Sequence, residues 1–137
     1  MEKDRLVRKL RLLIAEDDRA LANVLRIVLE GEGFEVTHCR DGHSAIQTLS
    51  ALRDSGTPPD IILLDLNMPR VDGWTVAAWL DTDPQLEAIP VIVISASEAH
   101  GRAAKVLNVD AYLVKPFTTD EIIGVVSLFT MLLRRHD

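Results

Sequence analysis

The run Ile61-Ile62-Leu63-Leu64 stops directly on a carboxylate, Asp65, and constrains the fold more than any other stretch. A short apolar run with prolines on both sides is typical of a strand that is buried on both faces, as in a parallel sheet. Asp65 would then lie at the carboxyl end of the strand, the edge where open α/β sheets bind ligands. A turn or helix-cap aspartate is the alternative, because Asp is common in both places.

Four other segments have strand character, and helical patterns separate them. The strands are expected at residues 11–15, 34–39, 90–95 and 111–114. Apolar residues at helical spacing follow each strand, with helices expected at about 19–31, 45–52, 74–80 and 99–107 and from 119 toward the carboxyl terminus. Five strands alternating with five helices predict βαβ units, and hence a doubly wound α/β fold with one five-stranded parallel sheet.

Length and composition limit the classes of protein to which this chain can belong. The 137 residues fit one domain, with an arm at 1–10 and a single domain at 11–137 without an output domain. The uncharged stretch from Ile122 to Leu133 is too short to span a bilayer, and the charged amino terminus is unlike a signal peptide, so a cytoplasmic protein is expected. A formal net charge of -6 opposes direct nucleic-acid binding. The single cysteine, Cys39, is expected to fill the core.

Polar side chains follow four of the five predicted strands. Glu16, Asp17, Asp65, Ser95 and Lys115 should share one edge, since the strand ends of a parallel sheet lie together. Converging carboxylates repel one another unless a cation neutralises them, and an oxygen-only ligand set without His or Cys suits Mg²⁺. The ammonium and the hydroxyl could hold the oxygens of a phosphoryl group on Asp65, which predicts a carboxylate nucleophile that forms an acyl phosphate.

Each of these residues has an ordinary explanation when taken alone. Ser95 could be a turn residue, Lys115 a surface lysine, and the acidic run a solvated helix entrance. Their joint placement after separate strands favours a site instead. The acidic run also leaves its register open, because the paired acids could be Glu16-Asp17 or Asp17-Asp18. Strand length favours the first pair and leaves Asp18 as the cap of the following helix.

Together these segments resemble the receiver domain of two-component response regulators, over nearly the whole chain from Arg11 to about Arg135. The resemblance implies a flavodoxin-like (βα)5 fold and a phosphohistidine donor, either a sensor histidine kinase or a histidine phosphotransfer protein. The motifs that carry it are Leu-Leu-Ile-Ala-Glu-Asp-Asp at 12–18, Leu-Leu-Asp-Leu-Asn-Met-Pro at 63–69, Asp72-Gly73, Ser95-Ala96 and Tyr-Leu-Val-Lys-Pro-Phe at 112–117.

The resemblance also implies a metal site and a phosphoacceptor. Asp65 would accept the phosphoryl group. Asp17 and Asp65 would bind Mg²⁺ directly, the backbone carbonyl of Asn67 would complete the protein ligands, and Glu16 would act through water. The domain would promote its own phosphorylation and dephosphorylation without being an enzyme in the usual sense.

Further roles follow from the same resemblance. Ser95 and the lysine of a cis Lys115-Pro116 peptide would contact the phosphoryl oxygens. Ser95 would move toward the phosphoryl group, and Tyr112 would rotate inward to fill the space, a two-state switch. An ordinary half-buried strand tyrosine is the alternative for Tyr112. Asn67 and Ser97, each two positions after a site residue, are expected to tune the lifetime of the acyl phosphate.

The last helix has more apolar surface than one face requires. Besides a stripe that faces the sheet, Val125, Leu128 and Leu132 form a second stripe at helical spacing. We expect this stripe, together with the strand of Tyr112, to meet an identical subunit or a downstream protein. Coverage by the amino-terminal arm is the alternative.

Two other functions are less consistent with the sequence. A phosphohydrolase with an aspartyl nucleophile normally has a second Asp two residues later, and Asn67 occupies that position. A receiver-like binding module that works without phosphorylation would lack part of the site, whereas this chain has every member of it.

Overall fold

The computed structural model describes residues 8–97 and 109–135. Its five strands form one parallel sheet in the order β2-β1-β3-β4-β5. They are β1 (Arg11–Ala15), β2 (Glu35–Cys39), β3 (Ile61–Asp65), β4 (Val91–Ser95) and β5 (Ala111–Val114). The described helices are α2 (Arg19–Gly31), α3 (Gly42–Asp54), α4 (Gly73–Asp81) and α6 (Thr119–Arg135).

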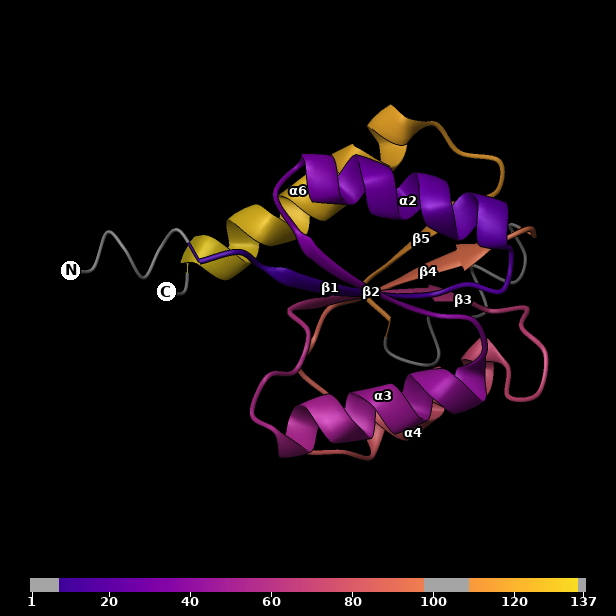
Figure 1. The fold of residues 1–137 in the computed structure, drawn as a ribbon, viewed down its shortest axis with the longest axis vertical. Coiled ribbons are helices and arrows are strands. Elements are labelled where there is room, and N and C mark those ends of the chain that lie inside the picture. The colour runs from indigo at the N-terminus through magenta and orange to yellow at the C-terminus, as the bar shows by residue number, and fades with distance from the viewer. Residues whose placement is uncertain (1–7, 98–108, 136–137) are drawn as a thin grey trace.

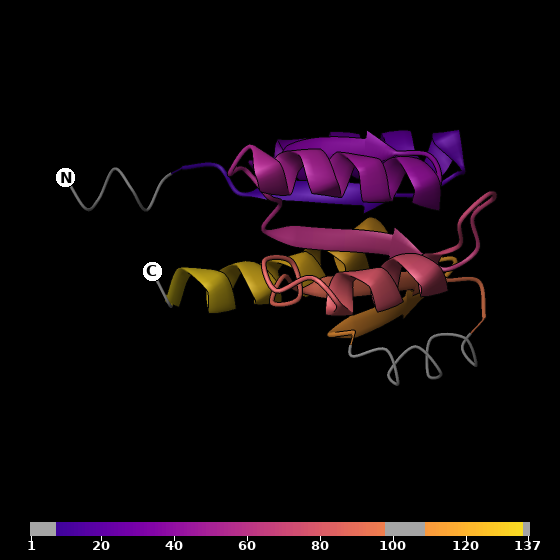
Figure 2. The ribbon, with the colours of Figure 1, turned by 90° about the horizontal axis from the view of Figure 1, so that it is seen from below.

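The predicted doubly wound fold is confirmed. Helices α2 and α6 cover one face of the sheet and α3 and α4 cover the other, as Figure 1 shows with the sheet edge-on and Figure 2 from below. The helix predicted near 99–107 and most of the predicted arm lie outside the described residues. Within the described part of the chain, no helix combines the length and the apolar character needed to cross a membrane.

Strands β3 and β4 are buried along their whole length, as their uninterrupted apolar runs predict. Alternate residues of β3 point to opposite faces, so that Leu63 joins the core under α2 and α6 while Leu64 joins the core under α3 and α4. Cys39 is a buried free thiol at the end of β2, which confirms its predicted place in the core.

Four of the helices begin with a side-chain cap, which fixes where each one leaves its loop. Asp18, Asp41 and Asp72 each accept a hydrogen bond from the backbone N–H three residues further on, at 3.1, 2.7 and 2.9 Å. Thr118 and Glu121 form a reciprocal capping box at α6, with both bonds at 3.1 Å. The predicted cap roles of Asp18 and of the Thr118 box are therefore confirmed.

An ion pair joins the end of α3 to the loop after α4. Arg53 contacts both Asp83, whose side chain is 12% exposed, and Asp54, whose side chain is 71% exposed. Burial by itself would raise the pKa of Asp83, but hydrogen bonds from Arg53 and from the Gln85 backbone outweigh it and hold that pKa below its ordinary value of 3.8. The charged form of Asp83 therefore stabilises the fold above that pH, and its contribution is lost as the pH falls through the lowered pKa.

We expect Asp83→Asn to lower the urea midpoint at pH 7 and to differ less and less from the parent as the pH falls below about 3.8. Asp54→Asn removes the same charge from an exposed partner of the same arginine and should change the midpoint little. Urea unfolding at pH 7 and at pH 3 measures both variants. Equal losses in the two variants would contradict the assignment.

Candidate functional site

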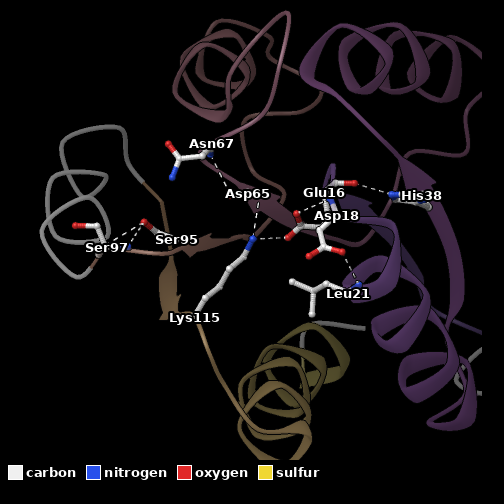
Figure 3. A network of polar contacts seen from close by, with 9 residues as sticks. All are labelled: Glu16, Asp18, Leu21, His38, Asp65, Asn67, Ser95, Ser97 and Lys115. Atoms are coloured by element: carbon white, nitrogen blue, oxygen red, sulfur yellow. Dashed lines mark hydrogen bonds and ion pairs between the residues drawn. The ribbon is translucent and has the colours of Figure 1, made fainter.

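Three of the predicted site residues converge where β1, β3 and β5 end. Figure 3 shows Glu16, Asp65 and Lys115 pointing toward one another from these three strand ends. The Lys115 Nζ lies 2.8 Å from Glu16 Oε1 and 3.3 Å from Asp65 Oδ2. Glu16 is fully buried, Asp65 is 2% exposed and the Lys115 side chain is 24% exposed. The carboxyl ends of the strands thus collect two buried carboxylates around one ammonium.

Burial and ion pairing act against each other on Glu16 and on Lys115, and the net shift raises both pKa values. Removal from water is the largest effect on Glu16 and raises its pKa to about 7, although Lys115 opposes the rise. Burial would lower the pKa of Lys115, but the carboxylates of Glu16 and Asp65 outweigh burial and raise it. The ammonium therefore stays charged at neutral pH, while Glu16 stands near the balance of its two forms.

The acidic cluster has the composition of a divalent metal site. Glu16, Asp17 and Asp65 each offer one carboxylate oxygen, and these oxygens lie within 4.8 Å of one another. Among the described residues, the buried Glu16 Oε1 accepts no well-directed hydrogen bond, and its contact with Lys115 is an ion pair. A buried carboxylate oxygen without a well-directed hydrogen bond, beside two other carboxylates, fits a hard cation with oxygen ligands.

The backbone around Asp65 is tightly built. The Asn67 N–H donates to Asp65 Oδ1 at 3.0 Å, and the Gly73 N–H donates to the Leu66 carbonyl at 3.0 Å. A Cβ on Gly73 would lie 2.2 Å from the Asp65 carbonyl oxygen and 2.6 Å from the Leu66 Cα. The first residue of α4 therefore needs to be glycine, because the helix begins in contact with the backbone that carries Asp65.

Ser95 ends β4 beside this group, but its hydroxyl is engaged elsewhere. The Ser95 Oγ donates to the Ser97 carbonyl at 3.0 Å and accepts from the Ser97 N–H at 3.1 Å (Figure 3). Its carbonyl accepts from the Lys115 backbone N–H at 2.7 Å, which ties the ends of β4 and β5 together. Tyr112 is half-buried and packs against the core on the α3 and α4 face. The Lys115-Pro116 peptide is cis, as predicted.

The apolar stripe of the last helix is narrower than predicted. Val125 is half-buried and packs against the core, so it does not belong to an exposed surface. Leu128 and Leu132 are 54% and 43% exposed, and Met131 beside them is 63% exposed. The face of α6 that packs against this core is wider than one stripe, because Ile123 and Val125 contact it as well as Ile122 and Val126.

The family comparison agrees with this geometry. The family model for the response regulator receiver domain matches residues 12–127, which covers all five strands except the first residue of β1 and about the first half of α6. The chain belongs to the response regulator receiver domain family. It is thus the receiver domain of a two-component response regulator, and receiver domains of this kind interact with histidine kinases and are in general not enzymes.

Individual relatives show how similar this chain is to known response regulators. The DNA-binding response regulator MtrA of Mycolicibacterium paratuberculosis is 34% identical over 129 residues, which cover 93% of this chain and 52% of MtrA. The chain therefore spans about half the length of the curated relatives it matches first. A crystal structure of a response regulator from Chloroflexus aurantiacus superposes with a TM-score of 0.81 at 26% identity, covering 90% of this chain and 99% of the other.

A third relative bears on the acidic cluster. The Mn²⁺-bound form of the response regulator Rcp1 is 32% identical to this receiver domain, with a TM-score of 0.70 and coverage of 85% of this chain and 88% of the other. In this chain the carboxylates that could hold a metal ion are those of Glu16, Asp17 and Asp65.

Sequence patterns missed two contacts at this edge. The His38 Nε2 lies 2.8 Å from the Glu16 backbone carbonyl, so the end of β2 supports the end of β1 (Figure 3). Lys115 pairs with Glu16 as well as with Asp65, whereas the sequence suggested only contacts with a phosphoryl group. The alternation of β2 placed His38 near a strand end, but no spacing rule identifies its partner.

Proposed function

We propose that Asp65 is the phosphoacceptor of this receiver domain and that the phosphoryl donor is a phosphohistidine on a sensor histidine kinase or a histidine phosphotransfer protein. The observation that carries the proposal is the environment of the Asp65 carboxylate. A backbone N–H holds Oδ1 and the Lys115 ammonium contacts Oδ2, at the strand end where the fold binds its ligands. A carboxylate that is held in one orientation is ready to act as a nucleophile.

The transfer is a substitution at phosphorus. An Asp65 carboxylate oxygen forms the new P–O bond while the P–N bond of the phosphohistidine breaks. The electron pair of that bond returns to the imidazole nitrogen, which is left as neutral histidine after proton exchange with water. Lys115 is close enough to balance negative charge on the phosphoryl oxygens. Hydrolysis of the acyl phosphate reverses the modification, and we assign its promotion to this same site.

Mg²⁺ is the metal we assign to the acidic cluster. Asp17 and Asp65 would bind it directly, Glu16 would bind through water, and the Asn67 carbonyl would complete the protein ligands. Mg²⁺ takes few carboxylates and keeps several waters, which suits a cluster with one exposed and two buried acids. When bound, it supplies charge stabilisation for the transferring phosphoryl group.

The acceptor assignment is tested by intact mass. The domain incubated with acetyl phosphate and Mg²⁺ should gain one phosphoryl mass, and Asp65→Asn should gain none. Asp18→Asn is the matched control, because Asp18 caps α2 and Asn caps a helix equally well. It should be phosphorylated like the parent. A phosphoryl adduct on the Asp65→Asn variant, or no adduct on the parent, would contradict the proposal and favour a binding module that works without phosphorylation.

We also assign lifetime control to Asn67 and Ser97. Asn67 donates its backbone N–H to Asp65, and the Ser97 backbone contacts the Ser95 hydroxyl (Figure 3). In this assignment the two side chains control how water reaches the acyl phosphate. Asn67→Ala and Ser97→Ala should each change the rate of autodephosphorylation several-fold, as followed by the decay of the phosphorylated mass. Unchanged rates in both variants would contradict the assignment.

Phosphorylation is read out, in this proposal, through Ser95 and Tyr112. The Ser95 hydroxyl would exchange its Ser97 contacts for the phosphoryl group, and Tyr112 would turn inward. The exposed surface of Leu128 and Leu132, with Met131 in place of Val125, would then contact an identical subunit or a downstream protein. Light scattering that shows a monomer both with and without a phosphoryl mimic would exclude the dimer form.

Two other activities are not part of the proposed function, and the sequence gives the reason for each. Asn67 stands where an aspartyl phosphohydrolase would have its second acid, so net hydrolysis of a substrate is not the function we assign. The net charge of -6 argues against direct contact with nucleic acid, although relatives of twice the length have DNA binding in their names. A cytoplasmic location is part of the same proposal.

A further inference from the structure

A pocket of about 440 Å³ lies over the free edge of the sheet, one strand beyond the acidic site. Its walls come from the start of α2, the end of β2 and the first turns of α3. Figure 1 shows these elements together, with β2 at the sheet edge between the two helices. The polar residues that line the pocket are Arg19, Asn23, His38, Arg40, Ser44 and Thr48.

The pocket is positively charged, in contrast to the domain as a whole. Arg19 and Arg40 are exposed, and neither forms an ion pair with any other residue in the described part of the chain. No carboxylate is among the lining residues, and Cys39, which completes the wall, is a buried thiol whose pKa is raised by burial and which therefore stays neutral. Two unpaired guanidinium groups at one cavity favour an anion.

Asp41, which follows the pocket residue Arg40, is already engaged by other groups. Asp41 is 5% exposed, accepts the Ser44 N–H at 2.7 Å and lies 3.8 Å from the Arg70 guanidinium. Its carboxylate therefore has partners other than the two pocket arginines. The positive charge of the pocket remains available to a ligand.

Neutral donors complete the lining. The Asn23 carbonyl oxygen accepts from the Arg26 guanidinium at 3.3 Å, which leaves the Asn23 NH₂ as a donor. Thr48 and Ser44 add hydroxyl groups on the α3 side. Hydroxyl and amide donors beside two guanidinium groups match a phosphate ester, whose oxygens accept several hydrogen bonds at once.

We propose that this pocket is a binding site for a phosphate monoester, with Arg19 and Arg40 on the phosphate oxygens and the Asn23, Ser44 and Thr48 side chains around the rest of the ligand. The volume lies within the range of small-molecule sites, which runs from about 300 to 1,000 Å³. His38 lines the pocket and contacts the Glu16 carbonyl, so an occupied pocket adjoins the acidic site. The two sites are nevertheless distinct, since one collects carboxylates and the other guanidinium groups.

Calorimetric titration tests the proposal. The probes are inorganic phosphate and AMP, added to the full chain as Asp65→Asn in EDTA, so that neither acyl phosphate nor bound metal contributes. Both probes should bind saturably, and Arg19→Gln and Arg40→Gln should each weaken binding about tenfold or more. Tighter binding of AMP than of phosphate would show that the ester group is recognised. Equal affinity would overturn the ester assignment, because only the phosphate group would then be recognised.

A matched variant distinguishes binding at the pocket from an effect of the protein's net charge. Arg8→Gln makes the same charge change near the amino-terminal ends of β1 and β3, where Arg8 pairs with Asp60, and should leave the affinity unchanged. Amide shifts on titration should be largest at Ser44 and Thr48. Absence of saturable binding, or equal losses in the Arg8→Gln and Arg19→Gln variants, would overturn the proposal. Thermal melts check that each variant folds, and Arg40→Lys, which keeps the charge, should lose only part of the affinity.

Discussion

Replacement of Gly73 by alanine is expected to destabilise the domain by about 3 kcal/mol and to abolish phosphorylation. The new Cβ would lie 2.2 Å from the Asp65 carbonyl oxygen and 2.6 Å from the Leu66 Cα, and both are backbone atoms that cannot rotate away. Either α4 or the end of β3 has to shift. A shift of β3 would misplace the Asp65 carboxylate by a distance that matters for nucleophilic attack. Urea unfolding and intact mass after acetyl phosphate measure the two effects.

Gly124 provides the matched control for this variant. It lies in the middle of α6, is exposed, and has no heavy atom within 4 Å of the position that a Cβ would occupy. Gly124→Ala should therefore stabilise the domain by about 0.5–1 kcal/mol and leave phosphorylation intact, because alanine restricts the unfolded chain and favours the helix. Similar results for Gly73→Ala and Gly124→Ala would refute the close contact between α4 and β3.

Replacement of Lys115 by methionine is expected to destabilise the metal-free domain by about 3 kcal/mol, because it leaves the carboxylates of Glu16 and Asp65 buried without a cation. The cost should be at the low end of the range for broken buried pairs. Lys115 is partly exposed, and Glu16, whose pKa is already about 7, can take up a proton. Lys9→Met, at an exposed position, is the control and should cost little.

The same variant should bind Mg²⁺ more tightly than the parent. The Lys115 ammonium contacts two of the three carboxylates that we assign to the metal, so it repels a divalent cation and competes for the same oxygens. Thermal melts against Mg²⁺ concentration should show a larger stabilisation of the Lys115→Met variant than of the parent or the Lys9→Met variant. Equal stabilisation in all three would show that the ammonium and the metal do not share ligands.

The sequence predicted the fold because each strand and helix that the structure describes carries its own local signal. The apolar runs of β3 and β4 are long enough for strands and too uniform for a half-exposed sheet, and they are buried throughout. Asp18 and the Thr118 box marked helix starts that depend only on nearby residues. Topology then followed from the rules for parallel crossovers.

The sequence also located the site, because the carboxyl ends of parallel strands necessarily meet. Glu16, Asp65 and Lys115 come from positions far apart in the chain, yet each lies at the carboxyl end of a strand, and the structure brings Lys115 within ion-pair distance of both carboxylates. The direct role of each residue in phosphoryl transfer remains a proposal that the variants above test.

Only the tertiary structure decided what depends on distances between elements. Periodicity alone could not rotate Val125 toward the core and leave Leu128 in solvent, since both lie on apolar stripes of the same helix. Nor could it bring Arg19 and Arg40 to one pocket from two elements, or set Gly73 against the Asp65 backbone. Local patterns determine which elements form and which ends they share, whereas packing between elements determines which side chains meet.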